Sequence, residues 1–429
     1  MTEPVTDPVL PELPAGAWRD AAARVMARCD ELARVSSAPD RIERVYLSPE
    51  HAHVNRLAAG WLREAGLRTW QDQAGNQWGH RDGRDPDAPS LVLGSHLDTV
   101  PDAGRYDGIV GVLVAIEVVR LLGTALPTFP FGVDVVAFWD EEGARFGKAL
   151  LGSSAVAGSW DPAWWDLRDE HGVTLREAFD AFGLDPGRIG EAARAPSSLA
   201  GYLEAHIEQG PQLDRAGAPL GVVTSIASAR RFQLTVVGEA RHAGGTPYDA
   251  RHDALLGASE AVLAVERLSR AQHHVVGTVG RLETFPGAVN VVPGEARFTL
   301  DLRGELEGSR DLVWAQLGTE LDEITGRRGL TWTARQVHEA PAVACGPLLR
   351  DVLRAGIEDT GRRDAPDLFS PAGHDGMALG AVTDIGMLFL RNPDGISHHP
   401  DEAVSAADVE AGLRAFASAV LHLAHERSG

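Results

Sequence analysis

The chain has 429 residues, of which 44% are hydrophobic and 24% are charged, so it is longer than one hydrophobic core usually fills and has the composition of a globular protein. Lys and Arg number 40 against 61 Asp and Glu, and the formal net charge of -21 argues against a nucleic-acid partner. The N-terminus is acidic and Pro-rich, unlike a signal peptide, and no apolar run reaches the roughly 18 residues that a membrane span needs. The chain has only two cysteines. These features predict a cytoplasmic protein that does not act at a membrane.

The first half of the chain has the pattern of an α/β domain. Residues 16–35 and 49–65 have apolar side chains at helical spacing and predict two helices. Short apolar strands at 91–93 and 133–139 flank a predicted helix at 108–122. This alternation indicates a mixed, mostly parallel sheet with helices on both faces. In such sheets functional groups gather at the carboxyl ends of the strands.

A different pattern begins near residue 227. Apolar and polar residues alternate there, as strands of an antiparallel sheet with one covered face do, and a helix is predicted at 251–268. We therefore expect a smaller α+β domain at 227–340 that is inserted into a discontinuous catalytic domain made of residues 1–226 and 341–429.

Histidines and carboxylates follow the predicted strands of the larger domain. Each of them has an ordinary reading when taken alone, as a structural histidine or as part of a solvated loop. Three adjacent carboxylates that end an apolar strand would repel one another, and if buried they need a cation or raised pKa values. Imidazole and carboxylate ligands suit zinc, manganese, cobalt or nickel. Together they predict a divalent metal site, with candidates at His96, Asp107, 140–142, His206 and His398.

Eight motifs in order resemble the carbamoylase branch of the dinuclear metallopeptidase-like amidohydrolases. This family includes N-carbamoyl-L-amino-acid hydrolases, allantoate amidohydrolases and β-ureidopropionases, and the resemblance runs from about residue 45 to residue 425. The motifs are GSHLDTV (94–100), GRYDGIVGV (104–112), EEGARFG (141–147), EAHIEQGP (204–211), RHAGGTPYDARHDA (241–254), VNVVPGEARFTLDLR (289–303), AGHDGMALG (372–380) and GISHHPDEA (395–403).

The resemblance implies two divalent metal ions, zinc or manganese first and cobalt or nickel as alternatives. Asp107 matches the bridging ligand and Glu141 the general base, and His398 rather than His399 matches the last ligand. The inserted domain corresponds to a lid, through which the family's members usually form homodimers. The implied metal ligands are His96, Asp107, Glu142, His206 and His398.

The resemblance also implies four residues that act on the substrate. Gln209 reaches the same pocket as the metal ligands, His242 and Asn290 bind the substrate carbonyl or developing oxyanion, and Arg303 grips the substrate carboxylate. The alternative structural roles are a residue of a lid loop for His242, a turn residue for Asn290 and a surface charge on a strand for Arg303. His273 and His274 are expected to be solvated, and His374 is expected to form part of the pocket wall. The sequence departs from the family pattern at Gly245, Tyr248, Pro371 and 390–393.

The expected reaction is hydrolysis of a linear ureido or carbamoyl C–N bond in a small carboxylate compound, which releases ammonia and carbon dioxide. The resemblance favours allantoate over N-carbamoyl-L-amino acids as the substrate. The alternatives are a metallopeptidase or aminoacylase that acts on dipeptides or N-acyl amino acids, and an inactive, metal-stabilised binding protein. The HIEQG, VNVVPG and GISHHP motifs argue against the first alternative, and an intact Glu141 argues against the second.

Overall fold

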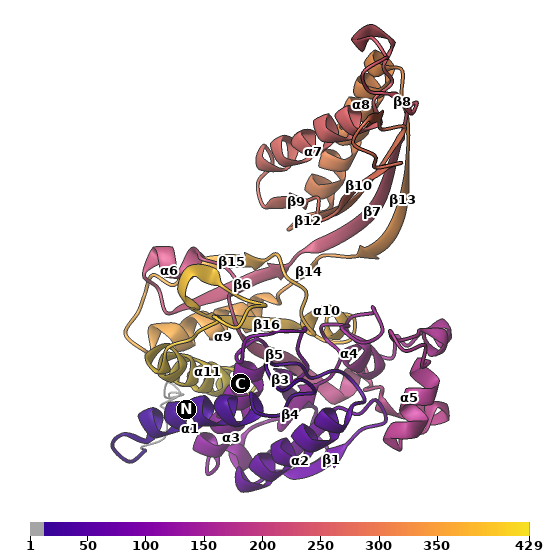
Figure 1. The fold of residues 1–429 in the computed structure, drawn as a ribbon. Helices are drawn as coiled ribbons and strands as arrows, with labels where there is room; N and C mark the ends of the chain where they lie inside the picture. The colour runs from indigo at the N-terminus through magenta and orange to yellow at the C-terminus, as the bar shows by residue number, and fades with distance from the viewer. Residues whose placement is uncertain (1–12, 429) are drawn as a thin grey trace. The chain divides into compact units, whose positions relative to one another are not determined.

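The computed structural model describes residues 13–428, and in it the chain forms two compact units (Figure 1). Unit 1 contains the described residues up to Thr224 and those of Ala344–Leu368 and from Gly373 onward, and unit 2 contains Ser225–Val343 and Phe369–Ala372. The sequence placed the inserted domain at 227–340 and contained no sign of the short return at Phe369–Ala372. Residues 1–12 of the acidic, Pro-rich N-terminus, which was expected not to be a signal peptide, lie outside the described residues.

Unit 1 is built on a mixed sheet with the strand order β1-β2-β4-β3-β5-β16-β6-β14, in which β15 pairs with β6. The central strands β4, β3, β5 and β16 are parallel, and β2 and β6 flank them in antiparallel pairing. The predicted mixed α/β sheet is confirmed, with its parallel pairing at the centre. The strands are β1 (Arg68–Gln71), β2 (Gln77–Arg81), β3 (Ser90–His96), β4 (Gly132–Phe138), β5 (Leu199–Ile207), β6 (Leu220–Ile226), β14 (Val343–Ala344), β15 (Asp367–Ser370) and β16 (Ile385–Leu390).

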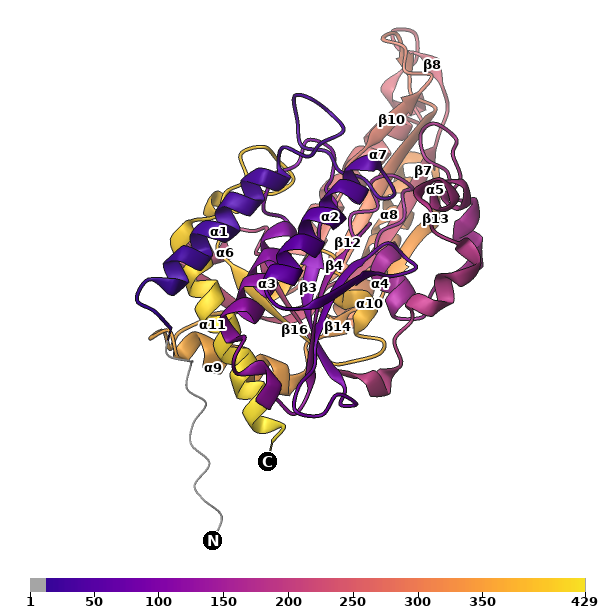
Figure 2. The same ribbon diagram turned by 90° about the horizontal axis from the view of Figure 1, so that it is seen from below.

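Helices cover both faces of this sheet, as Figure 2 shows with α1, α3 and α11 on one side and α4 and α10 on the other. The helices of unit 1 are α1 (Ala17–Leu32), α2 (Pro49–Glu64), α3 (Ile109–Leu122), α4 (Leu151–Val156), α5 (Leu175–Phe182), α6 (Gln212–Ala216), α9 (Pro347–Glu358), α10 (Gly376–Leu379) and α11 (Ala406–Glu426). Short 3₁₀ helices lie at Leu126–Thr128, Pro162–Asp166, Pro186–Ala192, Pro196–Ser198 and Pro393–Gly395 in unit 1 and at Tyr248–Ala250 in unit 2. Among residues 13–428, no helix has both the length and the hydropathy needed to cross a membrane.

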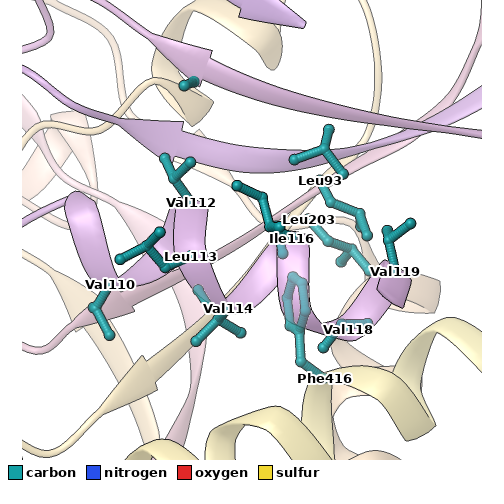
Figure 3. Close-up of a cluster of buried hydrophobic side chains, with 14 of the residues drawn as sticks. Leu93, Val110, Val112, Leu113, Val114, Ile116, Val118, Val119, Leu203 and Phe416 are labelled. Atoms are coloured by element: carbon teal, nitrogen blue, oxygen red, sulfur yellow. The ribbon is translucent and has the colours of Figure 1, made fainter. Parts of the chain in front are cut away.

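Helix α3 forms the centre of the core of unit 1 (Figure 3). Every residue of this helix except Arg120 is buried, which is expected of a helix that is apolar on all sides. It packs on β5 so closely that a Cβ atom at Gly111 would lie 1.9 Å from the carbonyl oxygen of Ala205. This contact holds the start of α3 beside the end of β5, and both ends carry predicted metal ligands.

Unit 2 is an antiparallel sheet with the order β10-β12-β7-β13, in which β9 also pairs with β12. Alternate residues of β12 are buried, as the sequence pattern predicted. Helix α8 and strand β13 were not predicted from the sequence. The elements are β7 (Ser228–Val237), α7 (Ala254–Arg270), β9 (Val275–Thr278), β10 (Leu282–Phe285), β12 (Glu295–Gly304), α8 (Glu307–Arg328), β13 (Thr331–Ala340) and the separate pair β8 (Arg241–His242) and β11 (Val291–Val292).

Candidate metal centre

The predicted ligands of unit 1 lie at one edge of its sheet. His96 is the last residue of β3, Glu142 follows β4 and His206 lies near the end of β5. Because β3, β4 and β5 are parallel, their carboxyl ends meet at the same edge. Asp107 precedes α3, and His398 follows β16 in the loop that leads to α11.

Asp107 lies between two sets of ligand atoms. Its Oδ1 is 3.2 Å from Nε2 of His206, and its Oδ2 is 3.0 Å from Nε2 of His398. The same nitrogen of His398 is 3.4 Å from Oε1 of Glu142. One set comprises His96, Asp107 and His206, the other comprises Asp107, Glu142 and His398, and within each set the ligand atoms lie within 4.8 Å of one another. A carboxylate shared by two sets has the geometry of a bridging ligand.

The hydrogen bonds of His206 indicate that a cation fits between it and Asp107. Nδ1 of His206 donates to the carbonyl oxygen of Ile207 at 2.8 Å, and Nε2 lies 3.2 Å from Oδ1 of Asp107 and 3.2 Å from the backbone nitrogen of Gly108. Oδ1 of Asp107 is buried and has no hydrogen-bond partner among the described residues. Although burial lowers the pKa of His206, the Asp107 carboxylate raises it to about 9, so the site favours positive charge at this point.

His96 has the neutral form that metal ligation requires. Burial lowers the pKa of His96 to about 4, so its ring is uncharged at neutral pH. Its Nδ1 lies 3.2 Å from the carbonyl oxygen of Asp98. The Asp98 carboxylate in turn accepts the backbone N–H groups of Glu141 and Glu142, at 3.2 and 3.1 Å, and so joins the end of β3 to the loop after β4.

Glu141 is buried beside the ligands but belongs to neither ligand set. Its Oε2 lies 4.0 Å from Nε2 of His96. Burial, followed by the charge of Glu142, raises the pKa of Glu141 well above its ordinary value. A carboxyl group in this position is suited to taking and releasing a proton near the ions.

Trp139 precedes this acidic loop and contacts two residues of α2, Asn55 and His51. The indole Nε1 donates to Oδ1 of Asn55 at 2.8 Å, and the ring stacks on His51 with the centroids 3.7 Å apart. Burial lowers the pKa of His51 to about 3.

Gln209 reaches the pocket of the predicted metal ligands, as expected from the sequence. Its Nε2 donates to Oδ2 of Asp107 at 2.9 Å, and its backbone adopts a φ of 57°, which turns the side chain towards this carboxylate. Ser397 Oγ lies 3.3 Å from the same oxygen, and Glu402 accepts the backbone N–H groups of Tyr106 and Asp107 at 2.8 and 3.1 Å. Gln209 therefore fixes the orientation of the Asp107 carboxylate, and its predicted contact with substrate stays a prediction.

Sequence reasoning did not name Asp98, Ser397 or Glu402, although each lies inside a quoted motif, within a few residues of a predicted ligand. His374 completes a third group of ligand atoms with Glu204 and His206. Its ring meets that of His206 edge-on with the centroids 4.6 Å apart, so it forms part of the wall beside the centre.

His242 and Asn290 lie together in unit 2. Strand β8 pairs with β11, and Ala243 N–H donates to the carbonyl oxygen of Asn290 at 2.9 Å. Both side chains are exposed. Gly245 N–H donates to Nδ1 of His242 at 2.9 Å, which places the proton of a neutral ring on Nε2 and makes that atom a hydrogen-bond donor.

Arg303 lies on β12 of the same unit, and its guanidinium already has partners. Nε and Nη2 each donate to Asp301 at 3.0 Å, and Nη1 donates to the carbonyl oxygen of Pro371 at 2.8 Å. These contacts fix the plane of the guanidinium and leave further N–H groups for a carboxylate. The acceptor Pro371 is one of the positions that depart from the family pattern.

Comparisons with known proteins agree with this site. The model of peptidase family M20/M25/M40 matches residues 92–422. The chain is 37% identical to an N-carbamoyl-L-amino acid amidohydrolase of Geobacillus stearothermophilus, with 94% of this chain and 98% of the relative covered, and 36% identical to an allantoate deiminase of Arabidopsis thaliana, with 90% and 79% covered. The crystal structure of a hydantoinase/carbamoylase-family amidase from Burkholderia multivorans is similar at a TM-score of 0.84, with 33% identity and coverage of 95% and 97%. The chain therefore belongs to the carbamoylase branch of the metal-dependent peptidase family M20/M25/M40 and is an amidohydrolase.

Proposed function

We propose that the chain hydrolyses the ureido or carbamoyl C–N bond of a small carboxylate compound at a centre of two divalent metal ions. The observation that carries this proposal is Asp107, a buried carboxylate between the ligand sets of His206 and His398, with one oxygen that has no hydrogen-bond partner among the described residues. His96, Asp107, Glu142, His206 and His398 would hold the ions, which when bound would polarise a substrate carbonyl and lower the pKa of water.

The chain's own residues then handle protons and charge. Glu141 takes a proton from the attacking water and delivers it to the leaving nitrogen. The water oxygen forms a bond to the ureido carbon, the C–N bond breaks, and the carbamate that results decomposes to ammonia and carbon dioxide. The buried position of Glu141 supports this role, since solvent does not compete for its proton.

Unit 2 supplies the groups that recognise the substrate in this proposal. Nε2–H of His242 and the amide of Asn290 stabilise the negative charge that develops on the carbonyl oxygen. Arg303 binds the substrate carboxylate through the N–H groups that Asp301 and Pro371 leave available.

We propose allantoate as the first substrate and N-carbamoyl-L-amino acids as the second, since relatives with both names match nearly the whole chain. We further propose zinc or manganese as the metal, ahead of cobalt or nickel, and a cytoplasmic homodimer that forms through unit 2. Light scattering of the purified protein tests the dimer: the mass of one chain in solution contradicts it.

Ammonia release tests the reaction. The metal-stripped chain is re-supplied with manganese, zinc, cobalt or nickel and given allantoate, N-carbamoyl-L-amino acids, N-carbamoyl-β-alanine or a dipeptide. Metal-dependent ammonia release from a ureido compound is the expected result. Cleavage of the dipeptide alone would assign the chain to the peptidases, and no turnover of any substrate with full metal content would support a binding protein.

A further inference from the structure

A second cluster of metal-ligating side chains lies in unit 2 and shares no residue with the centre described above. His273, His274 and Glu305 each offer one ligand atom, and these three atoms lie within 4.8 Å of one another. The two histidines lie between α7 and β9, and Glu305 follows β12. Strands β9 and β12 pair, and Glu305 N–H donates to the carbonyl oxygen of His274 at 3.1 Å, so the backbone holds the three residues together.

The side chains of His274 and Glu305 are held in place from several directions. Nδ1 of His274 lies 2.5 Å from Oε2 of Glu305, and Ser225 Oγ donates to Oε1 of Glu305 at 3.2 Å. The His274 ring stacks on Phe369 with the centroids 4.5 Å apart. The side chain of His274, which was expected to be solvated, is 38% exposed and is also hydrogen-bonded to Glu305.

A local hydrogen bond at the end of the β9–β12 ladder accounts for His274 and Glu305 but not for His273. The His273 ring lies beside that of His274 with the centroids 3.6 Å apart, which brings a second imidazole to the same carboxylate. Two imidazoles and one carboxylate form a donor set that suits zinc, copper or nickel and is unlike the all-oxygen sets of calcium and magnesium.

We propose that His273, His274 and Glu305 bind a divalent transition-metal ion of the zinc type, outside the catalytic centre. The three residues supply three ligands, and at this partly exposed position a water molecule completes the tetrahedron. Ser225 and Phe369 are the first residues of the two segments that make up unit 2. An ion at the cluster therefore fastens the turn after α7 and the end of β12 to both of these segments and stabilises unit 2.

Metal binding by the full chain tests this site once the catalytic centre is disabled. In a background carrying Asp107→Asn and His206→Ala, the stripped protein is titrated with Zn²⁺ by calorimetry and loaded with Cu²⁺ for electron paramagnetic resonance. We expect one equivalent of Zn²⁺ binding to be lost when His273→Ala is added, and the Cu²⁺ spectrum to lose the nitrogen hyperfine pattern of this two-imidazole site. Because other ligands of the catalytic centre remain, the difference between these two proteins is the decisive quantity.

Two comparisons keep the result interpretable. His171→Ala removes an exposed histidine of unit 1 and should leave binding as in the background, since that side chain is 78% exposed and belongs to no ligand set in the described part of the chain. Circular dichroism checks that His273→Ala remains folded. Equal Zn²⁺ binding with and without His273, or a Cu²⁺ spectrum that does not change, would overturn the proposal.

Discussion

The catalytic centre of unit 1 and the His242–Asn290 pair of unit 2 differ in how their side chains are held. Asp107 and His206 are buried, and each is held by further hydrogen bonds. His242 is exposed on β8, Asn290 is exposed directly before the paired strand β11, and the neighbouring Val289 is fully exposed. A metal ligand is useful when its neighbours fix it and water is excluded, whereas a group that meets a substrate must be open to it. Mutations in the two regions should therefore change different quantities among metal content, kcat and KM.

The largest effect is expected in the buried region, from Glu141→Gln. Loss of the proton carrier should lower kcat by about 10²–10⁴-fold while the bound metal remains, because Glu141 belongs to neither ligand set. Ammonia release and metal analysis on the same sample measure both quantities. Wild-type turnover in this variant would remove Glu141 from the mechanism.

His242→Ala should lower kcat by about 10²–10³-fold, the cost of one oxyanion donor. Because the side chain is exposed, metal content and melting temperature should stay at their wild-type values. His252→Ala, which removes another histidine of unit 2, provides the control. A change in metal content rather than in kcat would show that the contrast between the two regions is wrong.

Arg303→Ala should mainly raise KM for carboxylate substrates, by about 10–100-fold, since hydrogen bonds to a charged group contribute about 1.5–3 kcal/mol. Asp301→Asn should shift KM in the same direction by less, because it loosens the guanidinium without removing it. Steady-state kinetics on the best substrate measures both variants. A KM for Arg303→Ala equal to that of the wild type would show that Arg303 does not bind the substrate carboxylate.

Gln209→Leu should weaken metal binding by about tenfold, the low end of the range for groups that support a ligand, since Ser397 lies near the same Asp107 oxygen. Competition with a chelator measures the affinity, and KM at saturating metal should change little. A raised KM with normal metal affinity would instead support the substrate-binding role predicted from sequence.

The smallest effect is on stability and comes from His51, behind the acidic loop. Its pKa is about 3 in the folded protein and about 6.5 ordinarily, so unfolding takes up a proton between these values and stability falls as pH drops through this window. The contribution is at most about 1.4 kcal/mol per pH unit. Denaturant unfolding of the stripped wild type and His51→Gln, between about pH 4.5 and 7.5, should give a shallower pH dependence in the variant. His53→Gln, on the exposed side of the same helix, should retain the wild-type slope.

The order of the motifs was enough to predict the candidate ligands that lie close together in the structure, because His96, Glu142 and His206 lie at or just after the ends of parallel strands. Every residue of strand β5 is buried, including Glu204 and His206, since β3 and β16 flank it and helices cover the sheet, and the residue types alone do not indicate this. The side-chain direction of Gln209 depends on a left-handed backbone and on Asn392, which accepts its N–H at 3.0 Å, and no local pattern encodes a contact with so distant a residue. Helix α8 was missed because its buried apolar residues form only a narrow seam of Val313, Leu317, Leu321 and Ile324.

The ligands come from segments that are far apart along the chain, from His96 to His398. An unfolded chain cannot assemble them, so ions bind the folded protein and shift the folding equilibrium towards it. At a free metal concentration of 100 times the dissociation constant, this linkage adds about 2.7 kcal/mol for one site. If the proposed ions bind, metal supply would control the amount of folded protein that escapes degradation as well as the activity of each molecule.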